Sequence, residues 1–147
     1  MSTEAKQLTE EELLEKRETA RRERLETATK ARRFKDRTAI IDIEESDTVE
    51  LTIIDLAYRS DDLPVLIALR PPTDVELKRY RAGLKRDDKG NIGDATAVTN
   101  QIGRTCCVYP DAETLKKLSE HFGTLETQMG TEVLALSRGK VRAEGKG

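Results

Sequence analysis

The sequence predicts an α+β fold in which a small three-stranded antiparallel meander packs with about four helices and is preceded by a long charged helix. Residues 1–36 contain neither glycine nor proline and are rich in Glu, Lys and Arg, which favours one uninterrupted helix. From Thr38 onward, short β-branched runs are separated by turn residues. Beyond Pro72, apolar residues recur at helical spacing, which predicts the remaining helices.

The first helix is expected to run from about Thr9 to Arg33. Thr9 and Glu12 have the spacing of a capping box, which satisfies free backbone donors at a helix start. The apolar residues of this segment are too sparse to form a continuous stripe, so little of the helix can be buried against a domain. It is therefore either an arm that becomes ordered on a partner or a partly frayed surface helix.

Three strands are predicted at residues 38–43, 49–56 and 64–70, with turns at residues 45–47 and 60–62. In the second strand, apolar and polar residues alternate from Val49 to Ile53, which predicts one buried and one exposed face. The connections are short, and short connections favour antiparallel pairing.

Four helices should follow the prolines at 71 and 72, which end the third strand. Thr73 and Glu76 form a second capping-box spacing, and this helix is expected to reach about Lys85. A third helix should begin at Asp94 and continue until Pro110, because four apolar residues fall on one face of it: Val98, Ile102, Cys106 and Tyr109.

A short helix capped by Asp111 and a last helix ending at Gly139 complete the fold. The predicted organisation is a helical arm over residues 1–37, a domain over residues 38–139 and a flexible tail over residues 140–147. The core is expected to contain Ile41, Leu51, Ile53, Leu66, Ile67, Leu77, Tyr80, Val98, Ile102, Cys106, Leu115, Leu118, Phe122, Met129 and Val133.

The formal net charge of -2 hides a strong asymmetry along the chain. Residues 1–15 contain five Glu and one Lys, whereas residues 16–37 contain ten Lys or Arg and four acids. Such a basic segment can contact phosphate without reading sequence. It can equally be a solvated helix with ion pairs between residues four apart, because glutamates are interleaved with the cations.

The inventory of reactive residues is poor, and it predicts a protein without catalytic residues, metal or cofactor. The single His121 and the adjacent Cys106 and Cys107 cannot supply a zinc site. The glycines match neither a P-loop nor a dinucleotide-binding motif, and no GxSxG-like segment is present. Cys106 is expected to be a buried structural residue.

The cysteines and the hydropathy pattern indicate a cytoplasmic protein. Two adjacent cysteines form no disulfide framework, which fits a reducing compartment. No apolar run approaches the roughly 20 residues of a membrane-spanning helix. The start of the chain has acids where a signal peptide has a basic and then an apolar segment.

Residues 64–139 carry an ordered set of short motifs. Arg70-Pro71-Pro72-Thr73 is followed by a basic amphipathic helix around Tyr80, then by Cys106-Cys107-Val108-Tyr109-Pro110-Asp111, and finally by Phe122-Gly123 and a terminal helix. In this order and spacing the segment resembles phage tail assembly chaperones and chaperone-like tail proteins.

The resemblance implies a small non-enzymatic protein that binds the long helical tape measure protein and helps to recruit tail tube subunits in the host cytoplasm. A long amphipathic partner exposes apolar stripes that aggregate unless they are covered. The family often makes a longer frameshifted product as well, and the charged arm is not part of the family pattern.

The residues expected to bind protein partners are basic and fall in two groups. The first comprises Arg70, Lys78, Arg79 and Arg81, and the second comprises Arg21, Arg22, Arg32 and Arg33 of the arm. Two other functions stay open: a structural component retained in a phage tail or tail-like particle, and a nucleic-acid-associated protein acting through the basic arm. Membrane binding is not expected, nucleic acid is disfavoured, and self-association is left open.

Overall fold

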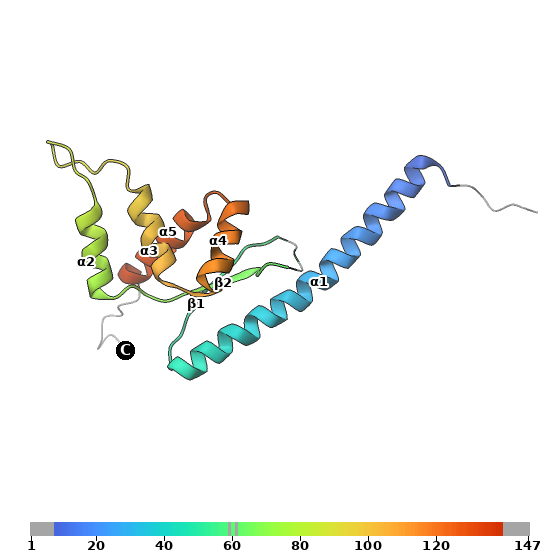
Figure 1. Ribbon diagram of the computed structural model, residues 1–147, viewed down its shortest axis with the longest axis horizontal. Helices are drawn as coiled ribbons and strands as arrows, with labels where there is room; N and C mark the ends of the chain where they lie inside the picture. The colour runs from blue at the N-terminus through green and yellow to red at the C-terminus, as the bar shows by residue number, and fades with distance from the viewer. Residues whose placement is uncertain (1–7, 59, 61, 140–147) are drawn as a thin grey trace, which may run out of the picture.

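A computed structural model describes residues 8–58, 60 and 62–139, and in it five helices pack with one three-stranded antiparallel sheet (Figure 1). The predicted α+β class is confirmed. The predicted tail over residues 140–147 and the first seven residues of the arm lie outside the described residues. The elements in chain order are α1 (Glu10–Asp47), β1 (Thr52–Asp55), β2 (Leu66–Leu69), α2 (Asp74–Gly83), α3 (Thr96–Thr105), β3 (Cys107–Tyr109), α4 (Ala112–His121) and α5 (Leu125–Gly139).

Helix α1 is the longest element, with 38 residues. It begins where predicted, because the backbone N–H of Glu12 donates to Oγ1 of Thr9 over 3.1 Å. Figure 1 shows α1 passing along the sheet and continuing well beyond the domain. At 1.5 Å per residue, α1 is about 57 Å long.

The strand predicted at residues 38–43 and the turn at 45–47 are wrong, because both segments belong to α1. The β-branched run was misleading because its residues also have helical spacing. Asp36 and Ile40 are buried, and Ile43 is half-buried at the next helical position. Burying this face against β2 stabilises the helix more than the β propensity of the run opposes it.

The third strand is β3, a segment predicted as the end of a helix. The strand order is β1-β2-β3, with β2 in the centre and both pairings antiparallel. Helices α2 and α3 form the connection between β2 and β3, so the sheet has the predicted antiparallel meander order but its second connection is long. Helix α3 ends at Thr105, and the backbone N–H of Arg70 then donates to the carbonyl oxygen of Cys106 over 3.0 Å.

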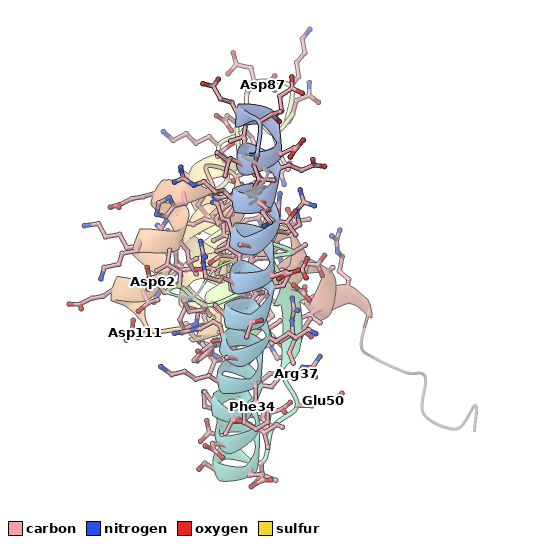
Figure 2. The ribbon with its side chains drawn as sticks, turned by 90° about the vertical axis from the view of Figure 1, so that its right-hand side faces the viewer. Phe34, Arg37, Glu50, Asp62, Asp87 and Asp111 are labelled. Carbon is pink, nitrogen blue, oxygen red and sulfur yellow. The ribbon has the colours of Figure 1, made fainter. Side chains whose placement is uncertain are left out.

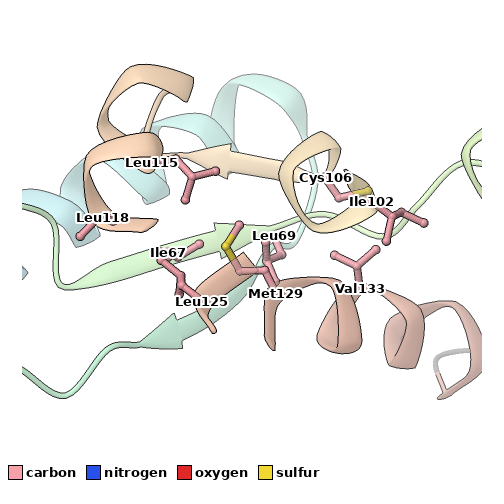
Figure 3. Packing of buried hydrophobic residues seen from close by; sticks show 9 residues of the cluster. All are labelled: Ile67, Leu69, Ile102, Cys106, Leu115, Leu118, Leu125, Met129 and Val133. Carbon is pink, nitrogen blue, oxygen red and sulfur yellow. The ribbon is translucent and has the colours of Figure 1, made fainter. Parts of the chain in front are cut away.

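Strand β2 is buried on both faces, which explains its unbroken apolar sequence. Ile67 and Leu69 face the larger core, which helices α3, α4 and α5 supply (Figure 3). On the opposite face, Leu66 and Ala68 pack with Ile40 of α1. The sheet is therefore covered on one face by helix α1 and on the other by the C-terminal helices.

Two predicted core residues are exposed. Ile53 is 39% exposed, because the neighbouring Ile54 points into the larger core and reverses the expected alternation of β1. Ile41 is 49% exposed, since it lies on the side of α1 that faces away from the sheet.

The helix starts agree with the sequence at three of four positions. Thr73 and Glu76 form the predicted capping box of α2, and Asp111 caps α4 by accepting from the backbone N–H of Thr114 over 2.8 Å. For α3 the prediction was wrong, because the N-cap residue is Ala95. Asp94 instead closes a turn by accepting from the N–H and the hydroxyl of Thr96.

Helices α3 and α5 cross at two glycines, which let the backbones approach closely. A Cβ atom on Gly103 would lie 2.6 Å from the backbone nitrogen of Gly130. A Cβ on Gly130 would lie 2.0 Å from the carbonyl oxygen of Thr99. Small residues are therefore required at both positions.

Candidate protein-binding surfaces

The base of α1 is fixed to the sheet by the buried carboxylate of Asp36. Its Oδ2 accepts the backbone N–H groups of Val65 and Leu66 over 2.8 and 3.2 Å. Its Oδ1 accepts the hydroxyl of Tyr109 over 2.5 Å and Nε of Arg32 over 3.1 Å. Burial and the bond to Asp36 raise the pKa of Tyr109 to about 12. One carboxylate thus joins α1, the start of β2 and the end of β3.

Arg32 and Arg33 were predicted to bind a partner, and both form contacts between α1 and the sheet. Arg32 also donates to the hydroxyl of Tyr109 over 3.3 Å. Arg33 donates through Nη2 to both carboxylate oxygens of Asp55 over 2.9 and 3.1 Å. These two arginines mark where the arm meets the domain.

From Leu8 to Arg24 the arm has no buried residue, and Arg21 and Arg22, which were predicted to bind a partner, are exposed. Glu12 precedes Lys16 and Glu18 precedes Arg22 by four residues, a spacing that stabilises an isolated helix by about 0.2–0.5 kcal/mol per pair. Figure 2, seen from the free end of α1, shows charged side chains projecting around the helix. The arm is therefore a helix that presents its whole circumference.

Arg70 was predicted to bind a partner, but it joins β2 to α2. Its Nη1 and Nη2 donate to Oε1 and Oε2 of Glu76, each over 2.7 Å, and Nη2 also donates to the carbonyl oxygen of Thr105. The hydrogen bond from Arg70 is the main reason why the pKa of Glu76 falls from 4.5 to about 2. A bidentate pair of this kind fixes the start of α2 against the end of α3.

Acidification should weaken the ion pair between Arg70 and Glu76. The pKa of Glu76 is lower in the folded chain than its ordinary 4.5, so its contribution to stability is complete above pH 4.5 and disappears as the pH falls toward 2. We expect the urea midpoint of the native chain to fall more between about pH 6 and pH 3 than that of the Glu76→Gln variant. Parallel pH profiles of the two proteins would contradict this assignment.

The other three predicted cations lie on α2. Lys78 is exposed and forms a 3.2 Å ion pair with Asp74. Arg79 lines a small hollow between α2 and α3, and Arg81 is exposed. The eight predicted residues do not form one surface, because three are structural, three lie on α2 and two lie on the arm.

A groove that the sequence did not suggest lies beside β3 and α4, with a volume of about 330 Å³. Val108, Pro110 and Leu115 give it an apolar lining, and Lys116 and Glu126 also line it. It was missed because β3 was predicted as a helix. It offers a second surface for an apolar segment of a partner.

Burial keeps both cysteine thiols protonated near neutral pH. Burial raises the pKa of the Cys106 thiol to about 11 and that of Cys107 to about 12. His121 is exposed at the end of α4. Within residues 8–58, 60 and 62–139, no three His, Cys, Asp or Glu side chains are grouped so that they could hold a metal ion.

Comparisons of the chain with models of protein families, with curated proteins and with solved structures found no match. None of the helices in the described part of the chain is both long enough and apolar enough to cross a bilayer.

Proposed function

We propose that this protein is a non-catalytic phage tail assembly chaperone that binds the tape measure protein in the host cytoplasm and helps to recruit tail tube subunits. The exposed arm of α1 carries this proposal. It is a helical surface that the domain leaves uncovered, and Leu13 and Leu14 are 48% and 58% exposed on it. A single exposed helix is suited to pack along another long helix.

The physical task of such a chaperone is to cover a partner that would otherwise aggregate. A long helical protein exposes apolar side chains along its length until it is assembled. The arm can lie beside such a helix while the domain, fixed to α1 through Asp36, keeps the arm oriented. The apolar groove beside β3 adds a place for a second contact.

Co-expression tests the proposal. The native chain, expressed with the longest helical protein encoded beside it, should keep that partner soluble and co-purify with it. The Leu13→Glu and Leu14→Glu double variant should lose both effects, because charges replace the apolar side chains of the arm. The matched control is Val75→Glu with Ile92→Glu, since these residues are 63% and 48% exposed on the domain.

A partner whose solubility does not depend on the native chain would contradict the chaperone function. Equal retention by both double variants would show that the arm is not the binding element. Mass spectrometry of purified particles gives an independent check, because a stoichiometric amount of this chain in them would contradict a transient role.

A further inference from the structure

Between Lys16 and Arg37, cations lie on both sides of α1, but the carboxylates lie on one side only, so the other side carries positive charge alone. Arg17, Arg21 and Arg24 follow one another at spacings of four and three residues, and Lys35 lies eleven residues after Arg24. At about 100° per residue, these spacings place all four on one side of the helix. We call these four residues the basic stripe, and all four are exposed.

The carboxylates of the same segment lie elsewhere on the helix. Glu18, Glu23 and Glu26 are each turned by about a quarter of a turn or more from the middle of the basic stripe. Between Arg24 and Lys35, the residues on this side are Ala28, Ala31 and Arg32, and Arg32 donates to Asp36. The stripe is therefore a band of positive charge about 27 Å long. The two alanines within it have small side chains, so they do not project from the helix as the cations do.

The domain does not cover the basic stripe. Thr29, Asp36 and Ile40 are the buried residues of α1 and define the side that faces the sheet. The stripe lies about a third of a turn away from that side. Lys35 remains exposed even though it lies where α1 rests on the domain, so the stripe is open along its whole length.

From this arrangement we infer that the basic stripe binds an acidic α-helix of a protein partner, with carboxylates at spacings of four and three residues. Arginine and carboxylate groups form bidentate bonds of defined geometry. The small side chains of Ala28 and Ala31 allow a second helix to approach α1 closely. Attraction between charges alone would not require such a close approach.

The charge pattern favours a helix over nucleic acid as the occupant. A polyanion would meet the carboxylates of Glu18, Glu23 and Glu26 as soon as it extended beyond the stripe. The formal net charge of -2 also gives the chain no general attraction for phosphate. That the partner is a tail protein rests on the proposed function, whereas the acidic helical chemistry follows from α1 alone.

The test uses a labelled alanine-based peptide of about 25 residues with glutamates on one helical face. A scrambled peptide of equal composition and a single-stranded oligonucleotide of similar length are the competing probes. Binding to the full chain is followed by fluorescence anisotropy at about 0.05 and 0.3 M salt, because exposed charge pairs are screened by salt.

Two triple variants remove the same charge from the same helix. Arg17→Gln, Arg21→Gln and Arg24→Gln remove three of the four cations of the stripe, whereas Lys16→Gln, Arg22→Gln and Lys30→Gln remove cations that point elsewhere. We expect the stripe variant to bind the one-faced peptide about tenfold or more weakly and the control variant to stay within about twofold. Circular dichroism confirms that both keep their helix content.

Equal weakening in both variants, equal binding of the scrambled peptide, or preferential binding of the oligonucleotide would overturn the inference. Absence of any peptide binding at low salt would overturn it as well. In the co-expression assay, full retention of the partner by the stripe variant would reject the stripe as its binding site while leaving the chaperone function intact.

Discussion

Replacing Asp36 with alanine should lower the free energy of unfolding by about 3–5 kcal/mol, because a buried charge network loses its centre. The change leaves the N–H groups of Val65 and Leu66 without their acceptor, and each unsatisfied buried group costs about 1–3 kcal/mol. It also leaves Arg32 and the hydroxyl of Tyr109 without their carboxylate. Urea unfolding followed by circular dichroism measures the loss.

Two further variants test whether the loss of stability in Asp36→Ala comes from its hydrogen-bond network or from substitution in general. Tyr109→Phe removes one of the donors to Asp36 and should cost about 1 kcal/mol. Asp42→Ala changes an exposed carboxylate of the same helix and should stay within about 0.5 kcal/mol of the native chain. A loss below about 1 kcal/mol for Asp36→Ala would show that the carboxylate does not fix α1 to the sheet.

The substitution Gly130→Ala should destabilise the fold by about 2 kcal/mol or more, although alanine is the better helix former by about 1 kcal/mol. The added Cβ would lie 2.0 Å from the carbonyl oxygen and 2.7 Å from the carbonyl carbon of Thr99. Both are backbone atoms, which cannot move aside without separating α3 from α5. The same denaturant titration tests this expectation.

Gly123→Ala is the matched control, because a Cβ at that position would have no neighbour within 4 Å. It should leave the urea midpoint nearly unchanged and the free energy of unfolding within about 0.5 kcal/mol of the native value. A neutral or stabilising Gly130→Ala would mean that the two helices are not in close contact.

The sequence predicted those elements whose local signals agree with their tertiary surroundings. The capping residues Thr9, Thr73 and Asp111 start helices as expected, because a side chain that accepts backbone N–H groups acts locally. Helices α4 and α5 were likewise recognised from apolar residues at helical spacing, and Leu118 and Met129 are fully buried.

The predictions from sequence were wrong for two segments whose structure is decided by their contacts with β2. The segment from Thr38 to Ile43 has strand propensity but is helical, since Asp36 and Ile40 share one face toward β2. Cys107–Tyr109 became a strand because β2 has a second edge to pair with. Neither fact is visible in local sequence.

The candidate surfaces were predicted only in part, because the sequence does not show which cations form hydrogen bonds or ion pairs within the fold. Arg32, Arg33 and Arg70 are held by Asp36, Asp55 and Glu76. Arg21 and Arg22 are exposed, yet they lie on different sides of α1. Arg17, Arg24 and Lys35 share a side of the helix with Arg21, and their spacing in the sequence indicates this.

Hydrogen exchange of the native chain, alone and in complex with its co-expressed partner, tests most directly whether the arm is the binding element. The arm has no tertiary cover, so its amides should exchange quickly in the free protein and slow down across residues 10–28 when the partner is bound. Protection confined to the domain, with the arm exchanging as fast in the complex as alone, would contradict the account.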